Sequence, residues 1–280
     1  MSEKAMKEHE EYLAWTYFSE DAYDQREFTR LRSLLHSTRL FIDVGASHGV
    51  YTFHVNRLIQ DAAIVAIEAD PSRFALLKDN VQQWSGTSTN AIACVHAAAS
   101  DEADRRQAES ASFYVTGSQI SGGLFAVPER SDDYRPTAVP LVTLDDYYRP
   151  GVPTLVKIDV EGAELRVLKG ATKHIESGHT TFLTEIAWFG DRQRRTGTLD
   201  VLLFAFRRGM RVERHTRSNY LLSYEPNALK RALSALQCLP PLVARYAWNR
   251  LVPLSVRKAR ERRLTAERFA RYHAKRQARP

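Results

Sequence analysis

The chain has 280 residues, of which 44% are hydrophobic and 26% charged, a normal composition for a globular protein with a buried core. Its two cysteines, Cys94 and Cys238, are far apart and form neither a disulfide framework nor a metal-binding pattern, which favours a reducing compartment. The N-terminal segment is charged, and no apolar run is long enough to span a bilayer. The sequence therefore predicts a cytoplasmic protein.

The formal charge of +7 is concentrated toward the C-terminus. Residues 225–280 contain 14 Lys or Arg and three acids, which gives this segment a formal charge of +11. A localised basic segment is attracted to anionic surfaces. We predict a basic helical tail over 226–280 that contacts an anionic membrane surface, a glycan lipid or a partner protein, with nucleic acid less favoured. Contact with a membrane would make the protein peripheral.

The first part of the chain, 1–38, has apolar residues at helical spacing and is predicted to be a helical N-terminal cap. From residue 39, short apolar runs alternate with helical stretches. The runs are LFIDV, AIVAIEAD, AIACVHAAAS, TLVKIDV and TTFLTEIAW, and the helices are expected over 50–59, 71–84, 163–177 and 198–208. This alternation predicts an α/β fold with a mostly parallel, seven-stranded sheet and helices on both faces.

The predicted α/β domain covers residues 39–225. A β-type insertion at about 112–144 interrupts its rhythm, and it contains a Gly/Ser-rich stretch that is a candidate substrate loop. MRVERHT and NYLLSYE are expected to close the domain as an antiparallel hairpin.

The segment FIDVGASHGVYT joins the first strand to a helix and is the first candidate ligand site. Glycines at Gly45 and Gly49 let the backbone at Ala46 and Ser47 approach a ligand and direct N–H groups at it. Asp43, at the strand's carboxyl end, is suited to the cationic amino group of the methionine part of S-adenosylmethionine. The loop lacks the G-x-G-x-x-G pattern of a dinucleotide site, and no Gly-Lys-Ser/Thr follows it, which disfavours a P-loop.

Two further acids follow the next strands. Glu68 ends the second run and is followed by Ala69, and a carboxylate at this position can accept hydrogen bonds from both ribose hydroxyls of a nucleoside. Ser100 and Asp101 follow the third run, beside the expected position of the base, where Asp101 can accept from the adenine amine. A turn or helix cap is the alternative role for Asp101.

The stretch LVKIDVEGAELRVLKGA places acids at the end of the fourth strand, where the reactive methyl group is expected. Asp159 or Glu161 is the candidate base that removes a proton from an acceptor hydroxyl. Asp159 and Glu185 are alternatively a candidate site for Mg²⁺, which would lower the pKa of that hydroxyl. Lys157 lies inside the apolar strand and needs an acidic partner there.

The runs FIDVGASHGVYT, IEADP, AASDE, VTLDDY, VKIDVEGAELRVLKGA and TEIAW resemble the FkbM-type methyltransferase family over residues 39–225. The resemblance implies a class I methyltransferase Rossmann-like fold with S-adenosyl-L-methionine as cofactor. It also implies O-methylation of sugars, lipopolysaccharide-type glycans or polyketide-like hydroxyls. Cofactor roles are implied for Asp43, Gly45, Glu68 and Asp101, and an active-site role for the segment from Asp159 to Glu161.

The leading prediction is an S-adenosylmethionine-dependent O-methyltransferase that acts on a hydroxyl of a sugar, glycan or small-molecule natural product. A Pro-Pro-aromatic segment after the fourth-strand acid would favour methylation of a base, but Val160-Glu161-Gly162 stands there. An RNA ribose methyltransferase that uses the basic tail remains an alternative. An NAD-dependent reductase and a non-catalytic binding protein with this fold are the other two alternatives.

Overall fold

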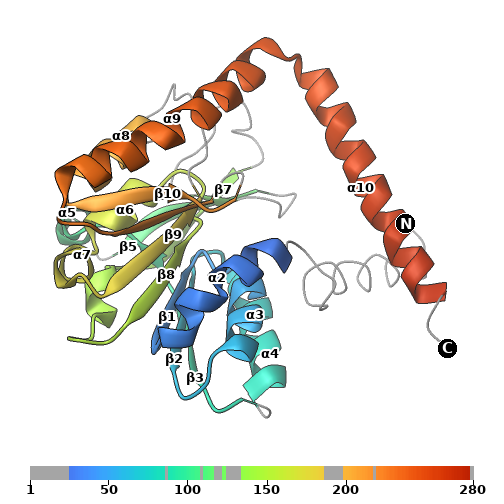
Figure 1. Ribbon diagram of the computed structural model, residues 1–280. Coiled ribbons are helices and arrows are strands. Elements are labelled where there is room, and N and C mark those ends of the chain that lie inside the picture. The colour runs from blue at the N-terminus through green and yellow to red at the C-terminus, as the bar shows by residue number, and fades with distance from the viewer. Residues whose placement is uncertain are drawn as a thin grey trace. The chain divides into compact units, whose positions relative to one another are not determined.

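The computed structural model describes residues 25–85, 88–107, 110–116, 122–123, 134–185, 198–216 and 219–277 (Figure 1). The described chain falls into two compact units. Glu27–Cys238 is the unit that carries the sheets, and the other unit includes the helices beyond Leu239. Most of the predicted N-terminal cap, 1–24, lies outside the described residues, and its final part is helix α2 (Gln25–Ser37).

The main sheet has seven strands in the order β10-β11-β9-β8-β1-β2-β3. β11 runs in the opposite direction to the other six strands, which are parallel to one another. The strands are β1 (Leu40–Val44), β2 (Ala63–Glu68), β3 (Ala91–His96), β8 (Thr154–Ile158), β9 (Thr180–Glu185), β10 (Met210–Arg214) and β11 (Asn219–Tyr224). The predicted seven-stranded, mostly parallel sheet is confirmed. The closing hairpin explains the mixed direction, because antiparallel strands need only a short connection.

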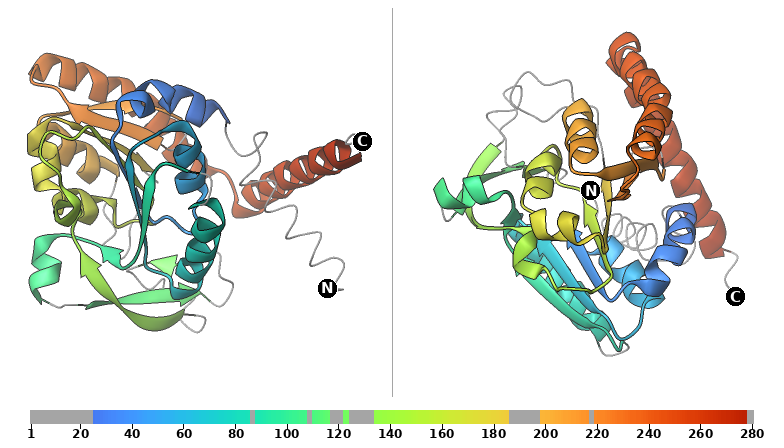
Figure 2. Two further views of the ribbon diagram at one scale, coloured as in Figure 1. Left: turned by 90° about the horizontal axis from the view of Figure 1, so that it is seen from below. Right: turned by 60° about the vertical axis from the view of Figure 1, so that its left-hand side comes forward.

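Helices cover both faces of this sheet (Figures 1 and 2). The helices between α2 and β10 are α3 (Val50–Leu58), α4 (Pro71–Ser85), α5 (Glu102–Gln107), α6 (Glu164–Lys169), α7 (Thr172–Ser177) and α8 (Thr198–Arg207), with a 3-10 turn, η2 (Leu144–Tyr147). On one face, Leu31 of α2 and Val55 of α3 are fully buried against Ile64. Ala66 lies two residues farther along β2, hence on the same face, and packs against Leu77 of α4.

The predicted insertion contributes a second sheet in the order β4-β7-β5-β6. Its strands are β4 (Ala98–Ala99), β5 (Ser110–Thr116), β6 (Gly122–Gly123) and β7 (Tyr134–Val142). The third apolar run therefore contributes a strand to each sheet, β3 to the first and β4 to the second. The Ala97 N–H donates to the Glu68 carbonyl oxygen at 3.2 Å, and the Ser100 N–H donates to the Val142 carbonyl oxygen at 2.9 Å. Part of the Gly/Ser-rich stretch, 117–121, lies outside the described residues.

The single helix predicted over 163–177 is two helices, α6 and α7. The first of these helices ends before Gly170, where a Cβ atom would lie 2.1 Å from the carbonyl oxygen of Ser100. The Gly170 carbonyl oxygen accepts a hydrogen bond from the Asp145 N–H at 3.0 Å, outside the helical pattern. Tertiary contacts with the ends of β4 and β7 therefore decide this boundary, and the local sequence does not show them.

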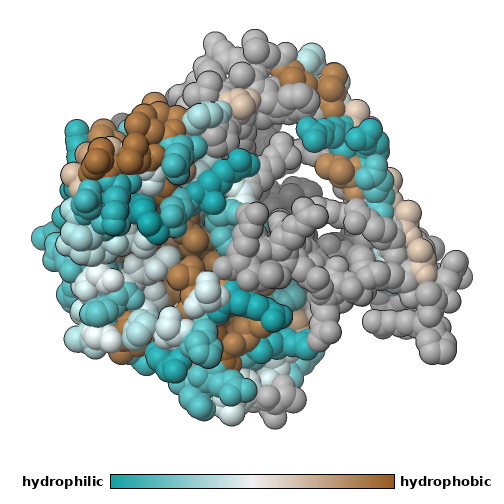
Figure 3. All heavy atoms as spheres, in the orientation of Figure 1, coloured by the Kyte–Doolittle hydropathy of each residue, from teal (hydrophilic) through white to brown (hydrophobic). Residues whose placement is uncertain are grey.

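Residues 228–277 form helices α9 (Ala228–Leu251) and α10 (Leu254–Gln277). The first turns of α9 belong to the sheet-bearing unit and cover its edge strand, β10. The Val212 N–H donates to Ser234 Oγ at 3.3 Å, and Cys238 Sγ lies 3.6 Å from the Val212 carbonyl oxygen. In the space-filling view, hydrophobic residues gather over α8 and α9 (Figure 3).

Candidate active site

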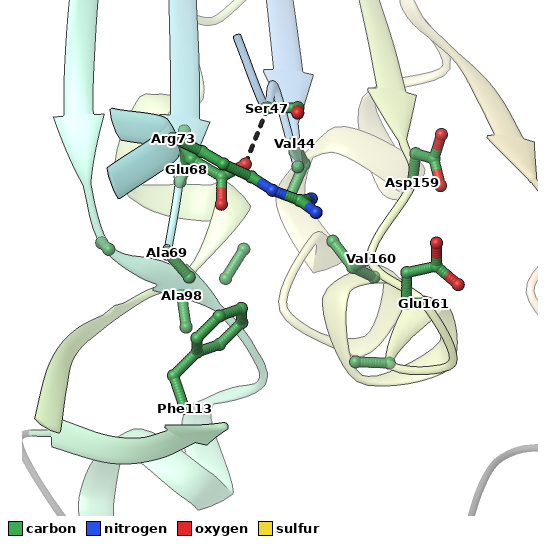
Figure 4. A pocket seen from close by; sticks show the side chains of 15 residues that line it. Val44, Ser47, Glu68, Ala69, Arg73, Ala98, Phe113, Asp159, Val160 and Glu161 are labelled. Carbon is green, nitrogen blue, oxygen red and sulfur yellow. Dashed lines mark hydrogen bonds between the residues drawn. The ribbon is translucent and has the colours of Figure 1, made fainter. Parts of the chain in front are cut away.

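A cavity of about 210 Å³ lies at the carboxyl ends of four adjacent strands, β3, β2, β1 and β8 (Figure 4). Residues in or just after each strand line it. They are Ala97, Ala98 and Ala99 after β3, Ile67, Glu68 and Ala69 at β2, Val44, Gly45 and Ser47 at β1, and Asp159, Val160, Glu161 and Ala163 after β8, with Arg73 and Phe113 beside them. Ligands of open α/β sheets bind at this edge.

In the loop between β1 and α3 the backbone lies close to the neighbouring strand ends, and its approach to a ligand stays a prediction. Gly45 and Gly49 have φ angles of +77° and +94°, which glycine adopts without strain. The N–H groups of Gly45 and Ala46 donate to the carbonyl oxygen of Ile67 at 2.9 and 3.0 Å. A Cβ atom on Gly45 would lie 1.9 Å from the carbonyl oxygen of Asp159. Gly45 therefore lets the ends of β1 and β8 meet beside the cavity.

We expect Gly45→Ala to destabilise the fold by about 3 kcal/mol, because it combines a left-handed φ with a backbone clash. Gly151→Ala is the matched control, since Gly151 has a φ angle of +72° and open space around its Cβ position. That variant should lose only about 1 kcal/mol, the conformational part alone. Urea unfolding of both variants measures the difference, and equal losses would show that the contact with Asp159 is unimportant.

Glu68 lies in the middle of the cavity wall and is 5% exposed. Its Oε2 accepts a hydrogen bond from the Ser47 N–H at 2.7 Å, and its Oε1 accepts one from the Asp70 N–H at 2.7 Å (Figure 4). Burial raises the pKa of this carboxyl group. Each carboxylate oxygen can accept more than one hydrogen bond, so both keep acceptor capacity. Glu68 therefore has the position and acceptor capacity predicted for binding ribose hydroxyls.

Small apolar side chains form the β3 end of the cavity. Ala69 and Ala98 pack with Phe113 of β5, backed by Val139 and Leu141. Three successive alanines after β3 leave room beside the phenyl ring, and a planar base fits such a slot. Phe113 was not predicted as a site residue. The alternating pattern of its strand shows that it faces one side, but not which ligand site lies there.

Arg73, on the first turn of α4, was also missed by sequence reasoning. Its guanidinium extends from the Glu68 side of the cavity toward Val44 (Figure 4). Arg73 lowers the pKa of Glu68, although burial has the larger, opposite effect on that carboxyl group. Among the described residues that line the cavity, Arg73 is the cation. Its position directly after the EADP run indicated that Arg73 is near the end of β2. Many residues of a helix of this length face outward, however, so the sequence did not show that Arg73 faces the cavity.

Of the predicted cofactor residues, Ala46, Gly49, Asp43 and the pair after β4 are not among the described residues that line the cavity. Asp43 is 2% exposed, and its Oδ2 accepts hydrogen bonds from the N–H and Oγ1 of Thr52 at 3.0 and 2.7 Å. Burial raises the pKa of Asp43 to about 6. Ser100 is buried, and Asp101 accepts a hydrogen bond from the Asp104 N–H at 2.9 Å at the start of α5. The contacts of these residues with a cofactor therefore stay predictions.

The β8 end of the cavity is acidic. The Asp159 side chain is 37% exposed, and its Oδ2 lies 3.3 Å from Nζ of Lys157, which is 1% exposed. The same Nζ lies 4.9 Å from the centre of the Tyr51 ring, so the predicted acidic partner of Lys157 is present together with an aromatic face. Glu161 is exposed and has a φ angle of +52°, an unusual conformation for a residue with a long side chain. Such strained positions concentrate at functional sites.

Glu164, the first residue of α6, is a buried acid behind this end of the cavity. It is 6% exposed, and its Oε1 accepts a hydrogen bond from the Gly162 N–H at 2.9 Å. Burial raises the pKa of Glu164 to about 7. Below about pH 7 the folded protein therefore favours a neutral carboxylic acid here, next to the segment from Asp159 to Glu161.

The raised pKa of Glu164 predicts a pH-dependent stability. Its ordinary pKa is 4.5, so the folded state binds its proton more tightly than the unfolded state. This contribution is complete below pH 4.5 and is lost as the pH rises through about 7. We expect wild type to lose about 3 kcal/mol relative to Glu164→Gln between about pH 4 and about pH 8. Urea unfolding at both pH values tests this, and a pH-independent difference would contradict it.

The predicted magnesium pair lies on neighbouring strands. Ile158 of β8 pairs with Thr184 of β9, so Asp159 and Glu185 each stand one residue beyond the paired positions. Within the described ranges, no group of three or more His, Cys, Asp or Glu side chains could hold a metal ion. The residues do not form a closed oxygen cage, and we derive no step through a metal.

The sheet order, with β11 between β10 and β9, and the glycine loop beside the cavity are those of the class I methyltransferase fold. The family follows from sequence comparison. Residues 43–245 match the model of the methyltransferase FkbM domain, and the chain belongs to this family. The resemblance noted from the motifs is thereby confirmed, and the match covers most of the chain.

Solved structures of methyltransferases are similar to this chain at low identity. The methyltransferase FkbM from Methylobacillus flagellatus is 18% identical, with a TM-score of 0.44, over 68% of this chain and 44% of that protein. An S-adenosylmethionine-dependent methyltransferase from Aquifex aeolicus is 10% identical, with a TM-score of 0.40, over 79% of this chain and 97% of that one. The present chain thus spans less than half of the Methylobacillus protein. No curated protein matches it.

Proposed function

We propose that the protein transfers the methyl group of S-adenosylmethionine to a hydroxyl of a sugar, a glycan or a small-molecule natural product. The observation that carries this proposal is the pair of accessible carboxylates, Asp159 and Glu161, at the β8 end of the cavity. They lie at the opposite end from the alanine slot after β3, which suits the adenine base. A carboxylate at the end of the cavity away from the adenine can accept a proton from an acceptor hydroxyl and does not contact the nucleoside of the cofactor.

The cofactor is proposed to lie along the strand ends. Its ribose hydroxyls donate to Glu68, and its methionine part passes the loop at Gly45. Arg73 is the candidate partner of the cofactor carboxylate, because an Arg guanidinium forms charge-assisted hydrogen bonds with carboxylates. This placement directs the sulfonium methyl toward Asp159.

The reaction is an in-line displacement at carbon. The acceptor oxygen forms a bond to the methyl carbon while the bond from that carbon to sulfur breaks, and neutral S-adenosylhomocysteine leaves. The hydroxyl proton passes to the carboxylate of Asp159. The sulfonium already activates the methyl group, so the protein contributes mainly alignment and proton removal.

The test is transfer of an isotope-labelled methyl group from S-adenosylmethionine into a panel of cell-envelope glycans, small hydroxylated metabolites and RNA. The NMR shift of the transferred methyl distinguishes attachment to oxygen from attachment to nitrogen or carbon. We expect labelled ether in a glycan or small-molecule fraction. Label found only on nitrogen or carbon would overturn the proposed O-methylation. A parallel assay with EDTA tests the Mg²⁺ predicted from Asp159 and Glu185.

An RNA ribose methyltransferase is the second candidate, favoured by the charge of +11 over residues 225–280. The same chemistry would apply, because the ribose 2′-hydroxyl is also an alcohol. Label in the RNA fraction would select this candidate. The reductase alternative is dropped, because the chain belongs to a methyltransferase family.

A further inference from the structure

Helices α8 and α9 expose a set of large apolar side chains within the sheet-bearing unit. Three lie on each helix at a spacing of four and then three residues, so each set forms a stripe on one side of its helix. The six are Leu199 (58% exposed), Leu203 (46%) and Phe206 (37%) on α8, and Leu229 (68%), Leu233 (50%) and Leu236 (58%) on α9. We call them the leucine face.

The fold does not need these side chains for its core. The opposite side of α8 supplies Val201, Leu202 and Ala205, which are 2%, 6% and 0% exposed. A helix that is apolar all round is normally buried on all sides. The opposite side of α9 is anchored on β10 through Ser234 and Cys238. The outward stripes of both helices are therefore not part of the core. Exposed apolar surfaces of this kind mark sites that bind another molecule or a membrane.

Helices α8 and α9 contact each other through Phe206 and Arg231. The guanidinium carbon of Arg231 on α9 is 5.5 Å from the centre of the Phe206 ring on α8. Figure 3 shows hydrophobic residues gathered over the two helices, next to hydrophilic ones. The leucine face thus consists of two stripes, one on each helix.

Charge decides which occupant suits this face. Arg207 and Lys230 are exposed on the same two helices, and α9 opens a segment whose formal charge is +11 over residues 225–280. A second copy of the chain docked symmetrically would bring these positive charges together, at a cost. An anionic lipid surface attracts them and also accepts leucine side chains at its acyl boundary.

We propose that the leucine face docks on the surface of an anionic lipid bilayer, where the exposed cations of the same two helices, Arg207 and Lys230, contact the headgroups. The attachment is peripheral, since no described helix is long and apolar enough to cross a membrane. The face is next to β10, at one edge of the sheet, whereas the cavity spans β8, β1, β2 and β3 toward the other edge. Docking therefore leaves the cavity open.

The test is co-sedimentation of the full chain with vesicles of phosphatidylcholine alone and of phosphatidylcholine with phosphatidylglycerol. We expect the mixed vesicles to bind the chain at least about tenfold more tightly than the neutral ones. Raising salt from about 0.1 to about 0.5 M should weaken that preference, because it screens the charges. Equal binding to both vesicle types, or binding to neither, would overturn the proposal.

The variants separate the apolar contribution from the charge. Leu233→Glu and Leu203→Glu should each weaken binding to the anionic vesicles about tenfold or more. Leu76→Glu is the matched control, because Leu76 is 54% exposed on α4 and adds the same charge away from the face. It should bind much more tightly than the two face variants. If all three variants weaken binding equally, the leucine face has no part in docking.

Two further readings complete the test. The face variants should keep the thermal shift that S-adenosylhomocysteine produces, which shows that they fold and that vesicle binding is separate from the cofactor site. Sedimentation velocity without lipid measures self-association. A wild-type dimer that Leu233→Glu dissociates, together with no binding to vesicles, would assign the face to a second copy and reject the lipid proposal.

Discussion

Replacing Asp159 by Asn is expected to lower kcat for methyl transfer by about 10²- to 10⁴-fold, the usual contribution of a positioned base. Asn keeps the size of the side chain and an oxygen acceptor for Lys157, whose Nζ lies 3.3 Å from Asp159 Oδ2. It removes the negative charge that takes up the hydroxyl proton. Cofactor affinity should change less than threefold, because Glu68 and the glycine loop are the residues proposed to bind the nucleoside. Single-turnover kinetics with saturating cofactor measures the effect.

The second acid at this end of the cavity provides the comparison. Glu161→Gln should lower kcat by no more than about tenfold, since Glu161 is proposed to assist the acceptor and not to remove the proton. If Glu161→Gln has the larger effect, the two roles are exchanged. If Asp159→Asn keeps a third or more of the wild-type kcat, neither a base nor an alignment role can be assigned to Asp159.

Glu68→Ala is expected to weaken binding of S-adenosylhomocysteine at least about 100-fold, because two charge-assisted hydrogen bonds to the ribose are lost together. The variant also removes the acceptor of two backbone hydrogen bonds, which the N–H groups of Ser47 and Asp70 donate to Glu68 at 2.7 Å each. The glycine loop should therefore lose part of its order, which adds to the loss of affinity. Titration calorimetry measures the change.

Two variants separate ribose binding from loop support. Glu68→Gln keeps one oxygen acceptor and should bind the cofactor product with intermediate affinity. Glu176→Ala removes a carboxylate whose side chain is 66% exposed, on helix α7, which contributes none of the described lining residues, and should behave as wild type. Unchanged affinity in Glu68→Ala would mean that the ribose does not lie against this acid.

The sheet could be predicted from the sequence because each parallel strand is a short apolar run. Alternation of such runs with helices permits few other arrangements. The acids and glycines at the strand ends could be predicted for the same reason, since the carboxyl ends of parallel strands meet at one edge. Glu68 and Asp159 accordingly line one cavity, although 91 positions separate them in the sequence. The local sequence pattern and the topology of a parallel sheet were therefore enough to predict this part of the site.

The remaining features depend on tertiary contacts. Gly170 ends α6 because the Ser100 carbonyl oxygen lies against it, and no helix-breaking proline marks that point. Phe113 reaches the cavity only because β5 pairs with β7 in a particular register. The Asp43 carboxylate accepts two hydrogen bonds from Thr52 and is not among the described lining residues, so its contact with the cofactor stays a prediction. A strand-end acid can face either the crevice or the following helix, and sequence pattern does not distinguish the two.

The central claim is that a sulfonium nucleoside lies across the ends of β3, β2, β1 and β8. Titration calorimetry of the full chain with S-adenosylhomocysteine tests it most directly, with NAD as the comparison ligand. We expect one site per chain, micromolar affinity and a negative heat-capacity change, because the base is buried in the alanine slot. No heat of binding for S-adenosylhomocysteine in folded protein, or tighter binding of NAD, would contradict the account.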